Sequence, residues 1–256
     1  MRERWVGAVR SDRFVVLVSL AAVAALAWIY LAWLAADMAG GSSPMDMVRI
    51  RSWPPSEFVF VFLMWTVMMV GMMIPSALPM VLVYAGIVRK AKRQGSAVAP
   101  TFVFVGGYLF AWTLFSAVAT IAQWSLDQAA LLSPMMVASS PAIGAALLVV
   151  AGVYQLTPFK DACLAHCRSP AHFLAEKWRK GLGGAFRLGI QHGFYCLGCC
   201  WALMLLLFVG GVMNLLWIAA IAFFVLLEKT MPGGRRASIL SGGALIAAGL
   251  LLLWRI

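Results

Sequence analysis

The residues best suited to chemistry lie in one short segment, HGFYCLGCC, at residues 192–200. On a helix with about 100° between successive residues, His192, Cys196 and Cys199 fall within about 60° of one another. Cys200 lies about 80° from the histidine on the same side. One imidazole and three thiols on one face predict a soft-metal site, because thiolate and imidazole suit zinc or Cu(I). The alternative is close helix packing, in which each cysteine acts as a small buried hydrophobic residue.

A second group of soft ligands, Cys163, His166 and Cys167, lies in the segment KDACLAHCRSP. If this segment is helical, the two cysteines are four residues apart and face the same way, with His166 one turn from Cys163. This spacing indicates a metal site or a vicinal dithiol. The alternative is a pair of reduced cytosolic thiols that take no part in function.

Methionine is abundant, with 15 residues, and six of them lie in one apolar segment, MWTVMMVGMMIPSALPM. On a helix, Met64, Met68 and Met72 form one stripe, and Met69 and Met73 form a second. Thioethers are soft neutral ligands, so a ladder of them suits the passage of Cu(I). Adaptable packing is the alternative reading of such stripes.

The composition places these segments in a membrane protein. The chain is 63% hydrophobic and 11% charged, whereas soluble domains have about 45–50% and 25%. The net charge of +11 does not indicate a nucleic-acid partner, because the charges lie at the termini and between apolar runs. With no charged residue inside a run, the sequence also argues against proton-coupled transport. Seven stretches approach the roughly 20 residues of a helical span: 14–36, 58–88, 102–126, 137–156, 188–209, 212–227 and 239–254.

These stretches predict an all-α, polytopic membrane helical bundle with about seven transmembrane helices. Of the 20 Lys and Arg residues, 17 fall on the side of the N-terminus in this arrangement, which predicts a cytoplasmic N-terminus. We expect one integral membrane domain over residues 1–256, in a bacterial inner membrane. The connection at residues 158–187 is expected to be cytoplasmic and to carry a short interfacial helix whose basic side faces anionic lipid.

Three blocks of sequence carry a family resemblance. They are MMVGMMIPSALPM at residues 68–80, YQLTPFKDACLAHCRSP at 154–170, and residues 189–228, which contain HGFYCLGCCWALM and GVMNLLW. In these blocks the chain resembles a bacterial family described as predicted metal-binding integral membrane proteins. The resemblance implies a multi-span fold in which the three blocks form the working centre.

The soft ligands predict a membrane protein that binds a transition metal, foremost Cu(I), and transfers or transports it, with zinc and haem open as alternatives. A second hypothesis is a membrane oxidoreductase that uses the same residues as a metal or dithiol redox centre. A third is a structural subunit. Lipid and a metallochaperone or metalloenzyme are the expected partners, whereas the oligomeric state and the direction of transfer stay open. The candidate metal ligands are Met68, Met72, Met73, Cys163, His166, Cys167, His192, Cys196, Cys199 and Cys200.

Overall fold

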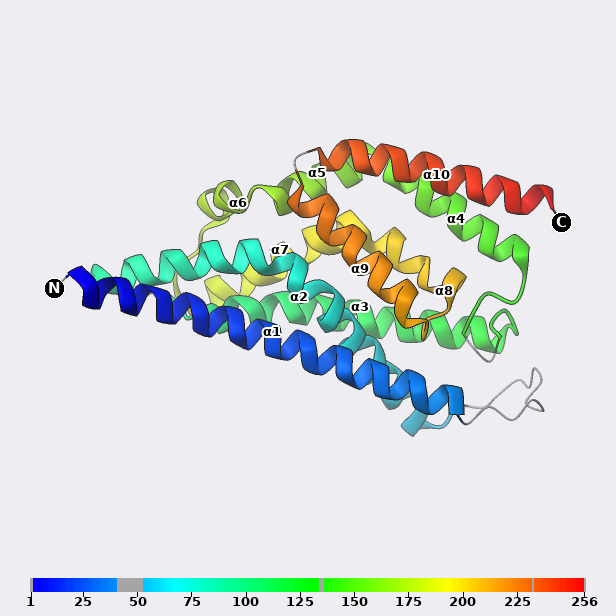
Figure 1. Cartoon of the computed structure of the whole chain (residues 1–256), viewed down its shortest axis with the longest axis horizontal. Coiled ribbons are helices and arrows are strands. Elements are labelled where there is room, and N and C mark those ends of the chain that lie inside the picture. The colour runs from blue at the N-terminus through cyan, green and yellow to red at the C-terminus, as the bar shows by residue number, and fades with distance from the viewer. Residues whose placement is uncertain (1, 41–52, 134–135, 232, 256) are drawn as a thin grey trace.

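The computed structural model of the chain describes residues 2–40, 53–133, 136–231 and 233–255. The described residues form helices and no β-strand, which confirms the predicted all-α class (Figure 1). The helices are α1 (Arg2–Gly40), α2 (Pro55–Arg93), α3 (Thr101–Gln128), α4 (Pro141–Gln155), α5 (Pro158–Arg168), α6 (Pro170–Lys177), α7 (Gly181–Leu205), α8 (Leu207–Gly210), α9 (Leu215–Thr230) and α10 (Gly234–Trp254).

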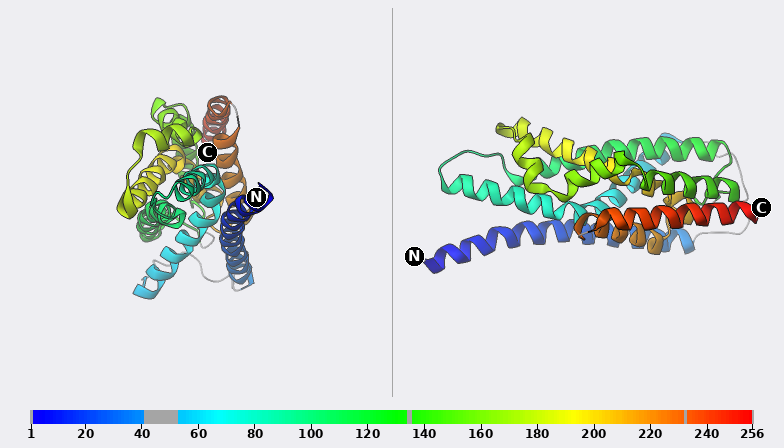
Figure 2. Two further views of the ribbon diagram at one scale, coloured as in Figure 1. Left: turned by 90° about the vertical axis from the view of Figure 1, so that its left-hand side faces the viewer. Right: turned by 90° about the horizontal axis from the view of Figure 1, so that it is seen from above.

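The long helices run roughly along the longest axis of the molecule, with α4 beside α10 on one side and α1 on the opposite side (Figures 1 and 2). Helices α3, α7 and α9 lie between these two sides. In the described part of the chain, five helices are long and apolar enough to cross a membrane, and the bent pair of α4 and α5 raises the number to six if it counts as one span.

The predicted number of seven spans is not confirmed. Helix α4 has 15 residues, and the axis bends by 64° where it meets α5. Helix α9 has 16 residues, and it follows a turn at Gly211, whose φ is +95°. Helix α9 is therefore shorter than the roughly 20 residues of a full span. The cytoplasmic position of the N-terminus stays a prediction.

A tryptophan on α1 compensates for the proline inside α2. Helix α2 continues through Pro75 and Pro79, although Pro75 has no N–H to donate to the carbonyl of Gly71, four residues earlier. The indole Nε1 of Trp28 donates to this carbonyl at 3.3 Å. This contact fastens α1 to α2 and keeps a buried polar group paired.

Helices α3 and α7 approach each other closely because each carries glycine at the contact. A Cβ on Gly107 would stand 2.0 Å from the carbonyl oxygen of Phe186, and one on Gly189 would stand 2.0 Å from the carbonyl oxygen of Phe104. The absence of two side chains therefore lets the backbones touch, as small residues do in membrane helix pairs. This contact sets the position of the α7 face that carries the cysteines.

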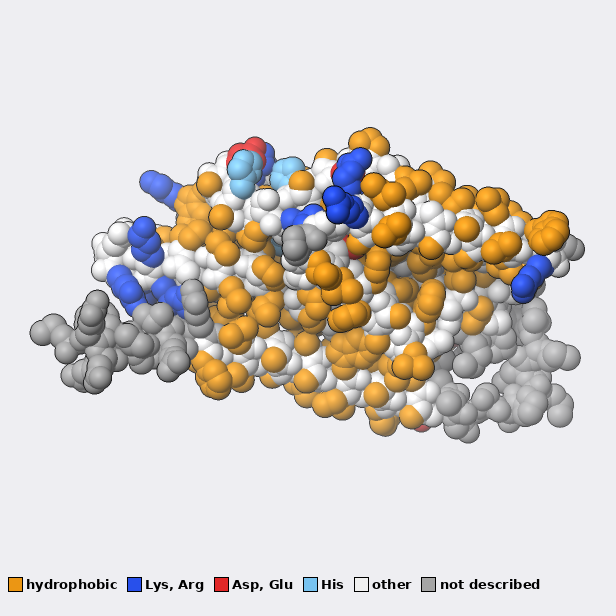
Figure 3. Space-filling model, turned by 45° about the horizontal axis from the view of Figure 1, so that its top comes forward, with side chains coloured by type: hydrophobic (Ala, Val, Ile, Leu, Met, Phe, Trp, Pro, Cys, Tyr) orange, Lys and Arg blue, Asp and Glu red, His pale blue; other side chains and the backbone are white. Residues whose placement is uncertain are grey.

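The surface is strongly apolar, and its basic residues are unevenly placed. Hydrophobic side chains cover much of the face in Figure 3, and the Lys and Arg side chains visible there lie mainly on its left half. Large exposed apolar residues include Phe14, Leu26 and Trp33 on α1 and Leu250 on α10. Such a surface is compatible with a membrane protein.

Helix α6 forms where the interfacial helix is predicted, and its Phe173 and Leu174 are buried in the protein. Contact of its basic side with anionic lipid stays a prediction. The expectation that charged residues lie only at the termini and between the apolar runs, away from the buried core of the bundle, is wrong. Lys160, Glu228 and Lys229, which the span assignment placed in connections, lie in α5 and α9 and are buried.

Candidate functional site

The predicted ligand face of α7 is buried inside the bundle. His192, Cys196, Cys199 and Cys200 are each at most 3% exposed. The thiols of Cys199 and Cys200 both donate to the carbonyl oxygen of Cys196, each at 3.0 Å. Helical spacing therefore gathers the three thiols within one turn, as the sequence predicts.

Helix α5 brings the second pair of cysteines to the same place. It begins at Pro158, directly after Thr157, whose hydroxyl accepts from the backbone N–H of Lys160 at 3.3 Å. The thiol of Cys167 lies near the thiols of Cys196 and Cys199. All five cysteines lie in the described residues, and all are free and buried.

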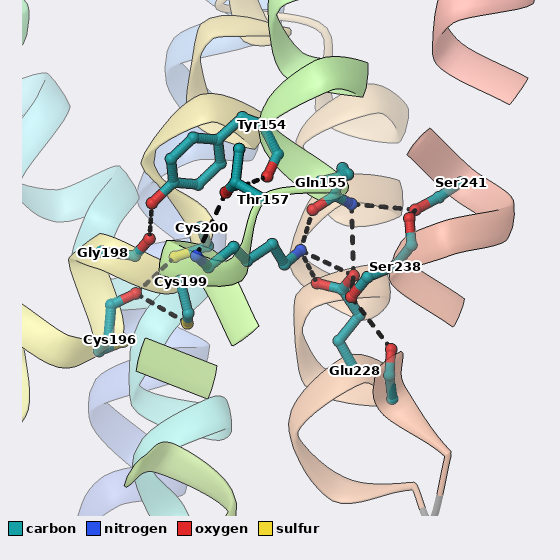
Figure 4. Close-up of polar contacts among 12 residues, drawn as sticks. Tyr154, Gln155, Thr157, Cys196, Gly198, Cys199, Cys200, Glu228, Ser238 and Ser241 are labelled. Atoms are coloured by element: carbon teal, nitrogen blue, oxygen red, sulfur yellow. Dashed lines mark hydrogen bonds and ion pairs between the residues drawn. The ribbon is translucent and has the colours of Figure 1, made fainter. Parts of the chain in front are cut away.

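The fifth thiol, that of Cys163, packs over a glycine. Its Sγ lies 2.7 Å from the place where a Cβ on Gly198 would stand, so a larger residue at that position would displace it. The hydroxyl of Tyr154, on α4, donates to the carbonyl oxygen of the same glycine, Gly198 (Figure 4). The two cysteine groups, predicted separately, thus form one cluster at the junction of α5 and α7, which we call the thiol cluster (Cys163, Cys167, Cys196, Cys199, Cys200).

Two side chains link the thiol cluster to the methionine-rich helix α2. The hydroxyl of Tyr108 contacts the Cys196 Sγ at 3.1 Å and donates to the carbonyl oxygen of Met73 at 3.2 Å. The ammonium of Lys229 donates to the same Cys196 Sγ at 2.9 Å and to the Ser76 hydroxyl at 3.0 Å. Residues from α3 and α9 therefore bridge α2 and α7.

The methionines of α2 are in the core. The five that form the two predicted stripes are each at most 1% exposed: Met64, Met68, Met69, Met72 and Met73. The sulfur of Met73 accepts from the Ser76 hydroxyl at 3.9 Å. Since Lys229 contacts both that hydroxyl and the thiol of Cys196, the thioether and the thiol cluster belong to one connected group.

The two candidate histidines differ in their surroundings. The ring of His192 stacks on Tyr108 and Phe104, with centroids 5.5 and 6.1 Å away. In the part of the chain that the structure describes, its Nδ1 is buried and has no hydrogen-bond partner. His166 is half-buried, stacks on Tyr195 with centroids 4.1 Å apart, and contacts the carbonyl oxygen of Ala162 through Nδ1 at 2.8 Å. His192 is the histidine that keeps an unused nitrogen inside the bundle.

Lys229 is the site residue that sequence reasoning missed. Glu228 and Lys229 follow the apolar stretch at residues 215–227, and Pro232 is the first helix-breaking residue after them. The absence of a breaker before residue 232 is the signal that the helix continues past residue 227. Helix α9 indeed ends at Thr230, which places two charged residues in its last turn.

The other charge, Glu228, belongs to a second buried network (Figure 4). Both carboxylate oxygens accept from the Lys160 ammonium at 2.8 Å, and Oε1 also accepts from the Ser238 hydroxyl at 2.8 Å. Lys160 also donates to the side-chain oxygen of Gln155, whose amide donates to the Ser241 hydroxyl at 3.0 Å. This network joins α4, α5, α9 and α10 beside the thiol cluster.

The side chains as placed do not close a metal site. Among the described residues, no group of three or more His, Cys, Asp and Glu side chains has an arrangement that could hold a metal ion. The donor set is nevertheless chemically consistent: thiols, thioethers and an imidazole are the ligands that soft metals prefer. Thiol hydrogen bonds and the Lys229 contact occupy this group in the structure.

Comparison with known protein families gives a match over most of the chain. A family model described as copper chaperone, PpoB2, matches residues 62–252. This range covers three quarters of the chain and includes every candidate ligand on α2, α5 and α7. No curated protein matches the chain, and no solved structure matches it.

Proposed function

The chain belongs to the copper chaperone family PpoB2, and from this premise we propose that it is a membrane protein that binds Cu(I) and passes it on through sulfur ligands. Five long apolar helices support the membrane setting. A bacterial inner membrane is the proposed location, and the proposed partner is a metallochaperone or a metalloenzyme that exchanges copper with this chain. Copper is cargo in this function.

The observation that carries the proposal is the thiol cluster itself. Five buried free thiols from α5 and α7 lie together, beside a buried run of thioethers on α2. Thiolate and thioether ligands select Cu(I) over harder ions. The unpaired Nδ1 of His192 adds a buried donor atom that a metal would satisfy, since buried polar atoms rarely lack a partner.

The roles follow the positions of the ligands along the bundle. We assign reception of the ion to the buried thioethers of α2, tight binding to the α7 group, and exchange with a cytoplasmic partner to the α5 group. The α2 group is Met68, Met72 and Met73; the α7 group is His192, Cys196, Cys199 and Cys200; the α5 group is Cys163, His166 and Cys167. The α5 group is the one that reaches the surface, because His166 is half-buried.

The test is the copper content of purified protein. The full chain is reconstituted with Cu(I) under reducing conditions, washed with a weak chelator and measured by mass spectrometry of the metal. Replacing Cys196 and Cys199 together by Ser is expected to remove the bound copper. Ala202→Ser is the matched control, because it adds a hydroxyl at another buried position of α7 and removes no thiol. Unchanged copper in the double variant would favour a structural role for the cysteines.

A dithiol relay is the second candidate function, because the Cys167 thiol on α5 lies near those of Cys196 and Cys199 on α7. It would make the protein an oxidoreductase that exchanges electrons with a thiol or a quinone. Thiol labelling under oxidising and reducing conditions separates the two functions. A relay requires a reversible disulfide between α5 and α7, and equal labelling in both conditions would contradict it.

A further inference from the structure

Lys229 directs a positive charge at the thiol cluster from the end of α9. It is 8% exposed, and its ammonium contacts the Cys196 thiol at 2.9 Å and the Ser76 hydroxyl at 3.0 Å. The Cys196 thiol that it contacts also contacts the hydroxyl of Tyr108, at 3.1 Å. An isolated ammonium in such a position is costly unless an opposite charge accompanies it.

The neighbouring carboxylate does not supply that opposite charge. Glu228 accepts from the Lys160 ammonium through both oxygens, so these two residues balance each other on the other side of α9. The same pair fixes the last turn of α9 against α5. Among the described residues, the ammonium of Lys229 therefore contacts a thiol and a hydroxyl and no carboxylate.

Copper binding by thiols generates the missing charge. When Cu(I) binds two thiols, each sulfur releases its proton and bonds to the metal, while copper keeps its oxidation state. One positive charge and two thiolates give a complex with a net charge of −1, together with two released protons. Such an anion is costly to bury alone, but with one ammonium at hydrogen-bonding distance the assembly is neutral.

We propose that Lys229 is the counter-charge of the copper complex at the stage where the ion passes between the α7 and α5 groups, bound as a bis-thiolate by Cys196 and Cys167. This inference rests on the proposed function and deepens it. Cys196 is the thiol that the ammonium touches, and Cys167 is a neighbouring thiol on α5. Because one ammonium balances one negative charge, the site uses two thiolates for each Cu(I), and the remaining thiols stay protonated.

The test compares Cu(I) affinity in three variants of the full chain by competition with a Cu(I)-specific chelator. Lys229→Met removes the charge and is expected to weaken binding by about 100-fold or more, because it leaves a buried anion unpaired. Lys229→Arg keeps the charge and is expected to bind within about tenfold of the wild-type protein. Lys177→Met is the control for net charge, because Lys177 pairs with Glu176 on the surface.

The outcomes separate this inference from the function on which it rests. If wild-type protein binds no copper through its thiols, both fail. If wild-type protein binds copper and Lys229→Met binds it with equal affinity, Lys229 does not balance the complex and the inference alone is overturned. Tighter binding by Lys229→Met would overturn it too, because Lys229 would then compete with the metal. Copper-edge X-ray absorption of the wild-type protein gives the coordination number of the copper, a measurement that needs no variant. Two-coordinate copper supports the role of Lys229 as the counter-charge. A site with three thiolates overturns it, because one ammonium would not balance that complex.

Discussion

Replacing Gly189 by alanine tests whether the α3–α7 contact positions the thiol cluster. The added Cβ would stand 2.0 Å from the carbonyl oxygen of Phe104 and 2.9 Å from the backbone nitrogen of Tyr108, whereas ordinary contacts begin at 3.4 Å. Backbone atoms cannot rotate away as a side chain can. The two helices must therefore separate locally by about 1.4 Å, the difference between the first distance and an ordinary contact.

This separation has an energetic and a functional consequence. Overpacking of a rigid contact costs about 1–3 kcal/mol, and the higher helix propensity of alanine returns up to about 1 kcal/mol. We expect a net loss of about 1–2 kcal/mol. A shift of this size also exceeds what the contact between the Tyr108 hydroxyl and the Cys196 Sγ, now 3.1 Å, can absorb, so Cu(I) binding is expected to weaken as well.

The assay is unfolding of the detergent-solubilised protein, followed by tryptophan fluorescence, with Cu(I) affinity measured on the same samples. Gly106→Ala is the matched control, because Gly106 lies on α3 and a Cβ there would meet nothing within 4 Å. That variant is expected to be as stable as the wild-type protein or slightly more stable. If Gly189→Ala proved equal to this control in stability and in affinity, the close helix contact would not be what holds the site.

Three further substitutions test other parts of the fold. Lys160→Met leaves Glu228 as a buried unpaired carboxylate and is expected to lower the free energy of unfolding by about 3–5 kcal/mol. Adding Glu228→Gln should recover most of the resulting loss in unfolding midpoint. If the double variant recovers nothing, the ion pair does not stabilise the fold. Gln123→Leu removes the acceptor of the buried Trp65 indole, 2.7 Å away, and should cost about 1–3 kcal/mol in chemical denaturation, whereas a neutral result would mean that the indole finds another partner. Gly211→Ala places a Cβ at φ +95° and should cost about 1–2 kcal/mol, seen as faster proteolysis between α8 and α9; an unchanged cleavage rate would show that this turn relaxes freely.

The sequence predicts local features well because they depend on short spacings. The α7 face with His192, Cys196 and Cys199 follows from helical periodicity alone. Helix α5 is anticipated by the four-residue spacing of Cys163 and Cys167. Both groups are buried or partly buried in helices, as expected.

The meeting of these groups could not be predicted in the same way. It depends on the 64° bend between α4 and α5 and on the glycine contact of α3 with α7, which are long-range features. The buried charges were missed for a different reason. Counting spans by hydropathy treats every charged residue as a boundary, whereas α9 continues through Glu228 and Lys229 and each of them finds a partner inside the bundle.

The cysteines of α5 and α7 are proposed to form one Cu(I) site. The single site is tested most directly by titrating Cu(I) into the wild-type protein and into Cys167→Ser and Cys196→Ser, with competition against a chelator to count the tightly bound equivalents. Each single variant is expected to lose the same tightly bound Cu(I) equivalent, because each thiol supplies half of one site. If the two variants lose different Cu(I) equivalents, or if neither loses any, the cysteines of α5 and α7 do not form one site.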